Sequence, residues 1–106
     1  MTTPRNEPRR STRVPIRIHI EVHSTGMSCD GETIVVNIHG ALVRTSSPLK
    51  LGEHITLHVE LTGKAAEGRV VLGTREHPLE FGIGFDHPQN IWGISLPPAD
   101  WQEESA

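Results

Sequence analysis

The chain has 106 residues, of which 35% are hydrophobic, and its formal net charge is −3. This length supports one domain with a modest core, and no stretch approaches the roughly 18 consecutive apolar residues that a membrane-spanning helix needs. The opening MTTPRNEPRR contains no apolar segment, so the sequence predicts no secretory signal. The single cysteine, Cys29, excludes an internal disulfide and is typical of a reducing, cytoplasmic location.

Positive charge is concentrated in the arginine-rich segment, residues 5–17, which reads RNEPRRSTRVPIR. Five arginines and one glutamate give this segment a charge of +4, whereas five basic and twelve acidic residues give the remainder −7. The acidic remainder would repel a long polyanion, which argues against general nucleic-acid binding. A cationic segment beside an acidic body predicts that the segment holds a small anion; the alternative is a solvated, flexible N-terminus.

Six short stretches have the alternating or apolar character of β-strands. The clearest begins at Val14, where every second side chain is apolar. The predicted strands cover residues 14–22, 33–36, 40–43, 55–61, 68–74 and 81–85. Between them, STGMSCDGE (24–32) is expected to form a turn that includes Cys29, and SSPLKLGEH (46–54) a loop with a turn at Gly52. Residues 61–64 are expected to form a hairpin turn.

Short strands separated by glycine and proline predict an all-β fold, a small antiparallel β-barrel of about six strands. The glycines of FGIGF (81–85) indicate a bend or a close backbone approach. We expect residues 1–8 to form a flexible arm, residues 9–101 a single barrel domain with a short C-terminal extension, and residues 102–106 a disordered tail. Only a short helical turn, over residues 98–104, is expected. Trp92 and Trp101 either cap the barrel or form a partner surface.

Seven histidines raise the possibility of a metal or catalytic site. His19 and His23 are four residues apart, as are His54 and His58, but both pairs fall in or beside predicted strands. Four strand residues span roughly 13 Å, which is too far for one ion, so these histidines are expected on the solvent face of the sheet. No Ser/His/Asp arrangement is evident, and GIGF is not followed by a helix that could hold a phosphate. We therefore predict no enzyme activity, no catalytic residues and no metal site.

Arginines recur at a spacing of four in three overlapping frames, 5/9, 9/13 and 13/17. Arg17 belongs to the first strand and Arg5 lies among turn residues, so the pair Arg9 and Arg13 is the best placed to fold over the barrel. RRSTRVPI followed by an alternating strand resembles the opening of a PilZ domain, the bacterial receptor domain for cyclic di-GMP. Three later segments, GALVR (40–44), LGEHITLHVEL (51–61) and FGIGF, follow in the family's order. The resemblance covers about residues 9–86.

The family's second motif, Asp/Asn-x-Ser-x-x-Gly, is altered in this chain. If Gly40 is the motif glycine, Asn37 occupies the serine position and Val35 the Asp/Asn position. If Asn37 is instead the first residue, His39 occupies the serine position and Leu42 the glycine position. The first alignment is preferred because it keeps the transition from strand to turn. Val35 cannot hydrogen-bond a guanine, whereas Asn37 offers a donor and an acceptor. Loss of one such bond lowers affinity roughly tenfold.

The resemblance implies that arginines hold phosphate and guanine and that the second motif holds the base. The candidate ligand-binding residues are Arg9, Arg10, Arg13, Asn37, His39 and Gly40. The implied function is a cytoplasmic cyclic di-GMP receptor or adapter that orders its arginine-rich arm on binding and signals to a downstream protein. Neither a further cofactor, a nucleic-acid polymer nor membrane insertion is expected. The alternative is a degenerate PilZ-like domain that binds no nucleotide and acts as a protein–protein interaction module. Val35 favours the alternative, and the arginine pair favours the receptor.

Overall fold

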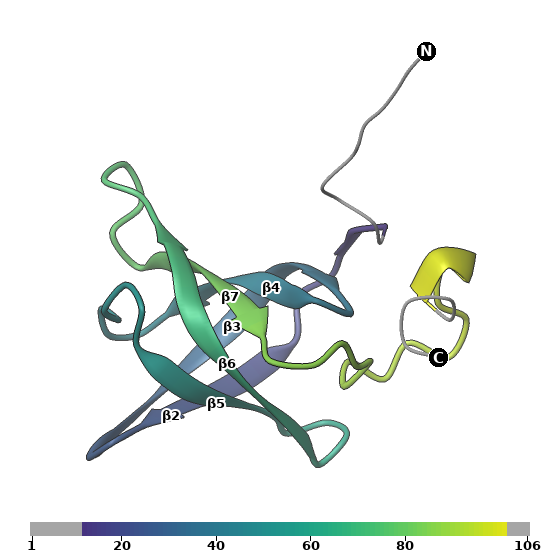
Figure 1. Cartoon of the computed structure of the whole chain (residues 1–106), viewed down its shortest axis with the longest axis horizontal. Coiled ribbons are helices and arrows are strands. Elements are labelled where there is room, and N and C mark those ends of the chain that lie inside the picture. Colours follow the sequence, from purple (N-terminus) through teal and green to yellow (C-terminus); the bar gives the residue numbers. More distant parts are fainter. Residues whose placement is uncertain (1–11, 102–106) are drawn as a thin grey trace.

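The computed structural model describes residues 12–101. The expected arm (1–8) and tail (102–106) lie outside these residues, as do Arg9 and Arg10. Within residues 12–101, seven strands form one antiparallel sheet in the order β1-β3-β2-β5-β6-β7-β4, and pairing of β3 with β4 closes it (Figure 1). The strands are β1 (Val14–Pro15), β2 (His19–Ser24), β3 (Met27–Asn37), β4 (Gly40–Thr45), β5 (His54–Val59), β6 (Lys64–Gly73) and β7 (Glu80–Phe85). The predicted all-β antiparallel barrel is confirmed, with six strands in the closed barrel and β1 as an addition.

The prediction of one continuous first strand is wrong, because β1 and β2 are separate. β1 pairs with the end of β3 and β2 with its beginning, so residues 16–18 stand opposite only residues 33–34. This is a bulge of one extra residue. The hydroxyl of Thr33 occupies the gap: it accepts a hydrogen bond from the Ile18 amide at 2.9 Å and donates to the Ile16 carbonyl. A side chain on the neighbouring strand therefore replaces the backbone bonds that the break removes.

The predicted turn at residues 24–32 is also wrong, because only Thr25 and Gly26 form it. β3 begins at Met27 and places Cys29 within a strand. Met27 and Cys29 are half-buried and pack against the core, whereas the side chains between and after them are exposed. This period-two pattern was hidden by the turn-forming composition of the segment. Residues 27–32 all pair with β2, and Gly31 and Glu32 pair with β4 as well, which outweighs that local preference.

The later elements largely follow the predictions. β5 ends at Val59 instead of Leu61, and β6 begins four residues earlier than expected, at Lys64. The predicted turns at Gly52 and Gly63 are confirmed, and both glycines have positive φ angles, 84° and 71°. None of the helical segments within residues 12–101 has the length and hydropathy of a membrane span.

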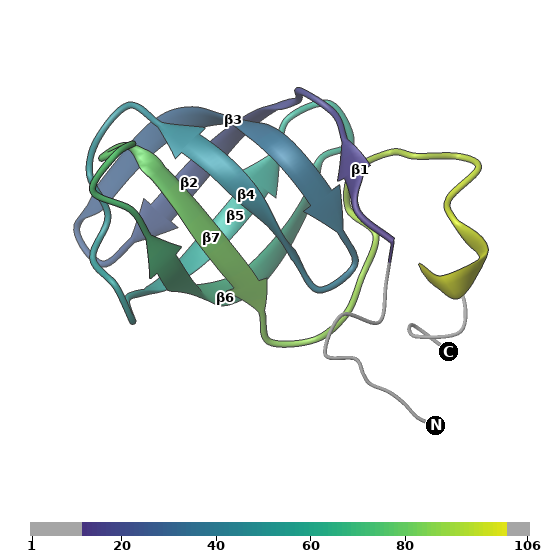
Figure 2. The same cartoon turned by 90° about the horizontal axis from the view of Figure 1, so that it is seen from above.

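The barrel interior is filled by inward-facing aliphatic side chains, and one end is closed by the C-terminal strap, residues 86–101 (Figure 2). Trp92 and Trp101 are each only 1% exposed, which confirms that they cap the core. Trp92 also stacks on Phe85, with ring centroids 5.6 Å apart. The expected helical turn begins at residue 99, and its continuation beyond Trp101 lies outside the described residues.

Candidate functional site

A groove of about 470 Å³ opens on the outside of the barrel and involves β1, β3, β4, β6 and β7. This volume lies within the range of about 300–1,000 Å³ that is usual for small-molecule sites. Fourteen residues line the groove: Arg13, Pro15, Val35, Val36, Asn37, His39, Gly40, Ala41, Leu42, Val71, Leu72, Gly82, Ile83 and Gly84.

The floor of the groove exists because β7 carries glycines between its inward-facing residues. Val70 pairs with Ile83 and Leu72 with Gly82, so Val71 is an extra, bulged residue. A Cβ atom on Gly82 would lie 2.9 Å from the Leu72 Cβ, which leaves no room for a side chain. The exposed side chains of Val71 and Leu72 therefore lie beside the part of β7 where Gly82 and Gly84 present no side chain outward. The expected bend or close backbone approach at these glycines is thus replaced by a close approach of the Leu72 and Val71 side chains.

The turn between β3 and β4 positions the second motif. Asn37 pairs with Gly40, and the two intervening residues form a tight turn. Gly40 has a φ of 150°, and a Cβ atom there would lie 1.8 Å from the carbonyl oxygen of Ile83 on β7, so only glycine fits. The Asn37 Oδ1 accepts a hydrogen bond from the His39 amide at 2.8 Å. Because the turn uses one lone pair of that oxygen, the Nδ2 group of Asn37 keeps both of its hydrogens for a ligand and Oδ1 keeps one lone pair.

Of the six candidate ligand-binding residues, four line the groove: Arg13, Asn37, His39 and Gly40. Arg9 and Arg10 lie outside the described residues. Arg17 does not line the groove; its Nε lies 3.7 Å from a carboxylate oxygen of Glu32. Arg17 lies in the break between β1 and β2, so its assignment to the first strand is wrong. That Arg17 is the poorer member of an arginine clamp stays a prediction.

The apolar half of the groove was largely missed at the level of sequence. Val35 is half-buried and lies between Pro15 of β1 and Leu42 of β4. With Leu72, these residues form an apolar lining. The sequence held one signal for it: Val70, Val71 and Leu72 interrupt the alternation of β6, as a bulge requires. Strand alternation alone could not show that Val71 and Leu72 line the same groove as Pro15 of β1.

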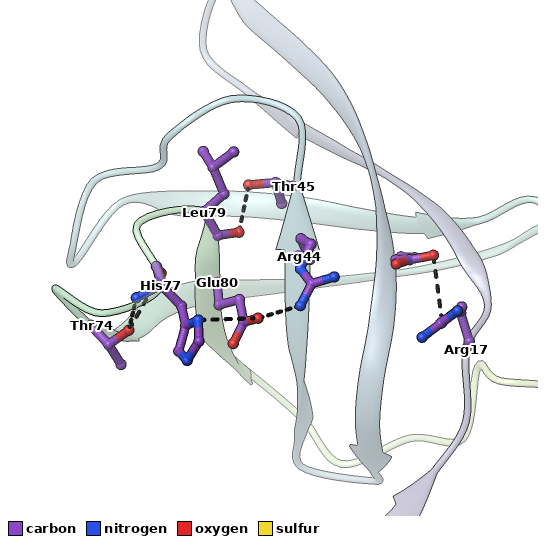
Figure 3. A network of polar contacts seen from close by, with 8 residues as sticks. Arg17, Arg44, Thr45, Thr74, His77, Leu79 and Glu80 are labelled. Atoms are coloured by element: carbon purple, nitrogen blue, oxygen red, sulfur yellow. Dashed lines mark hydrogen bonds and ion pairs between the residues drawn. The ribbon is translucent and has the colours of Figure 1, made fainter.

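A second polar cluster lies on β4 and β7 (Figure 3). Arg44 Nη2 donates to Glu80 Oε2 at 2.6 Å, and this hydrogen bond is the main reason why the pKa of Glu80 lies below its ordinary value and that of Arg44 above. His77 Nδ1 approaches the same carboxylate at 3.9 Å. Arg44 and Glu80 are direct cross-strand partners. Since their charges already satisfy one another, we assign this cluster to strand pairing.

The histidine pairs lie in β2 and β5, as expected, and His19, His23 and His54 are exposed. Within residues 12–101, one group of side chains could supply metal ligands: His54 Nε2 lies 3.5 Å from a carboxylate oxygen of Glu67 and 3.6 Å from one of Asp86. All three side chains are exposed. The same geometry is that of an ordinary surface ion pair, and His19 makes similar contacts with Glu60 and Asp30.

Comparison with known proteins gives one family. No curated protein matches the chain. The family model of the PilZ domain matches residues 5–91, which is well over half of the chain. The match includes the arginine-rich segment, all seven strands and the groove. PilZ domains are ligand-binding receptors for cyclic di-GMP rather than enzymes. With a closed antiparallel barrel and both motif segments at one groove, the chain belongs to the PilZ domain family.

Proposed function

We propose that the groove binds cyclic di-GMP and that Arg13 holds a phosphate or a guanine of this ligand. One observation carries the proposal: Arg13 and the turn residues Asn37, His39 and Gly40, which are far apart in the sequence, line the same groove. A guanidinium group offers a planar fork of donors that matches a phosphate or the O6 and N7 atoms of guanine. Arg13 is exposed at the edge of the groove, where it can reach such a group.

The apolar lining suits the other part of this ligand. Guanine has two flat faces that favour contact with apolar side chains, and Pro15, Val35 and Leu72 supply such a surface. Polar groups at the ends of the groove would then fix the orientation of the base. Because Val35 offers no hydrogen bond, we expect affinity to be lower by roughly tenfold than with a polar residue there.

Signalling would follow from the arginine-rich segment without any chemical step. Its charge of +4 disfavours a compact arrangement in the absence of an anion. A dianionic ligand would offset half of that charge and hold the segment against the barrel, which changes the surface that a partner protein meets. A cytoplasmic location and a downstream protein partner belong to this proposal.

Calorimetric titration of the full chain with cyclic di-GMP tests the proposal. Arg13→Ala should weaken binding at least tenfold, since it removes charge-assisted hydrogen bonds. The melting temperature without ligand should stay nearly unchanged because Arg13 is exposed. Arg17→Ala is the matched control, with the same loss of charge but outside the groove. Equal losses in the two variants would contradict the assignment of Arg13.

A second candidate is a protein–protein interaction module that binds no nucleotide. The apolar lining favours it, because Val71 and Leu72 are 61% and 53% exposed. A ligand that binds only the folded state raises the melting temperature. If millimolar cyclic di-GMP produces neither heat nor a thermal shift, the receptor proposal fails and the interaction module stands.

A further inference from the structure

The C-terminal strap contacts the backbone of the motif-bearing turn. The backbone amide of Gln89 donates a hydrogen bond to the backbone carbonyl of Ile38 at 2.9 Å. The indole Nε1 of Trp92 donates to the carbonyl of Asn37, also at 2.9 Å. The strap therefore supports the β3–β4 turn from the side of the barrel end.

The end of the strap holds Thr12, the residue immediately before Arg13. Asp100 Oδ2 accepts hydrogen bonds from the Thr12 amide at 2.9 Å and from its hydroxyl at 3.0 Å. Trp101 Nε1 donates to the Thr12 carbonyl at 2.7 Å. The strap thus forms hydrogen bonds with the amide, the carbonyl and the hydroxyl of Thr12. In both views the C-terminal turn lies near the start of β1 (Figure 1, Figure 2).

These contacts matter because little else in the described chain holds this part of the backbone. β1 contains only two residues, and its pairing with β3 is limited to Val14 and Pro15. Arg13 itself is exposed. Three hydrogen bonds at Thr12 therefore restrict the backbone from which the Arg13 side chain extends, and they do so while Arg13 lines the groove.

We propose that Asp100 and Trp101 are positioning residues for ligand binding: by holding Thr12, they place Arg13 at the groove before the ligand arrives. This inference rests on the proposed function. Preorganisation raises affinity because less conformational freedom is lost on binding. The strap thus makes the site depend on a segment that follows the last strand.

The charge of Asp100 makes the proposal testable, because the two effects of removing Asp100 change ligand affinity in opposite directions. Asp100 is an anion near a site for an anionic ligand, so electrostatics alone predicts that its removal tightens binding. Loss of the hydrogen bonds to Thr12 predicts the opposite result, weaker binding. Asp100→Asn separates the two effects, because the amide oxygen can still accept the bonds from Thr12 while the charge is removed. Its nitrogen would take the place of Oδ1, a buried atom that accepts no hydrogen bond within residues 12–101.

The experiment is calorimetric titration of the full chain with cyclic di-GMP. Asp100→Ala should bind about fivefold to tenfold more weakly than wild type, the order expected when a segment is immobilised on binding instead of beforehand. Asp100→Asn should bind at least as tightly as wild type. Trp101→Phe, which keeps an aromatic ring but removes the Nε1 donor, should show a smaller loss. Asp30→Ala removes a carboxylate near the other end of β3, outside the groove, and should not weaken binding.

Amide hydrogen exchange in the ligand-free protein supplies a second measurement. The Thr12 amide should exchange faster in Asp100→Ala than in wild type and remain protected in Asp100→Asn. The positioning role is overturned if Asp100→Ala binds as tightly as wild type, or if Asp100→Asn is equally weakened. If wild type itself binds no cyclic di-GMP, the proposed function fails and the positioning role fails with it. Thr12 exchange then still decides whether the contact with Asp100 holds the segment.

Discussion

Replacing Thr33 by valine tests whether one buried hydroxyl maintains the break between β1 and β2. Thr33 is fully buried, and its hydroxyl bonds both the Ile18 amide and the Ile16 carbonyl. Valine has nearly the same shape, so packing is preserved while both bonds are lost. The substitution therefore isolates the polar contribution of this side chain.

The expected loss of unfolding free energy depends on how the Ile18 amide and the Ile16 carbonyl are satisfied once the hydroxyl is gone. Ile18 is only 8% exposed, so its amide would be left without a partner, at about 1–3 kcal/mol. Ile16 is half-buried, and water can partly replace the hydroxyl at its carbonyl, so about 0.5–1.5 kcal/mol is expected there. The total is about 1.5–4.5 kcal/mol of unfolding free energy, a large share of the roughly 5–15 kcal/mol typical of a domain.

Urea denaturation followed by circular dichroism measures this loss. With a slope of about 1–1.5 kcal/mol per molar urea, the midpoint should fall by roughly 2 M. Thr33→Ser is the matched control, because it keeps the hydroxyl and loses only a methyl group, which contributes about 1 kcal/mol. Cyclic di-GMP should also bind more weakly to the valine variant, since the bulge sets the register of β1 beside Arg13. Equal stability of the valine and serine variants would refute this explanation of the break.

Two further predictions concern the groove and the ion pair on β4 and β7. Val35→Asn should strengthen cyclic di-GMP binding by roughly tenfold in a calorimetric titration, because it adds a base-binding amide, while it lowers stability where that amide stays unpaired; unchanged affinity would contradict the preferred motif alignment. The hydrogen bond from Arg44 holds the folded-state pKa of Glu80 below the ordinary 4.5. The stability that this ion pair contributes is therefore present above pH 4.5 and is lost as the pH falls through the lower folded-state pKa of Glu80. Urea midpoints should therefore decline less in acid for Arg44→Gln than for wild type, and parallel declines would argue against this linkage.

Much of the barrel follows from local pattern, as β5 illustrates. Ile55, Leu57 and Val59 alternate with polar residues, and period two is a property of the strand itself, so their burial was predictable without any partner. The turns at Gly52 and Gly63 were predictable for a similar reason, because a positive φ angle is a local requirement that glycine meets at little energetic expense. Arg13 could be assigned to the site from its place in the arginine frame just before the first strand.

Other features depended on residues that are distant in the sequence. At the strand break, the Thr33 hydroxyl bonds the backbone of Ile16 and Ile18. β3 extends through the turn-forming composition of residues 27–32 because these residues pair with β2. The groove brings Val35 together with Leu72, and Thr12 meets Asp100 across 88 residues of sequence. Such contacts carry no periodic signal in the sequence. The length and geometry of the intervening chain, along with closure of the barrel, decide which side chains meet, so only the tertiary structure could place Asp100 and Trp101 next to the site.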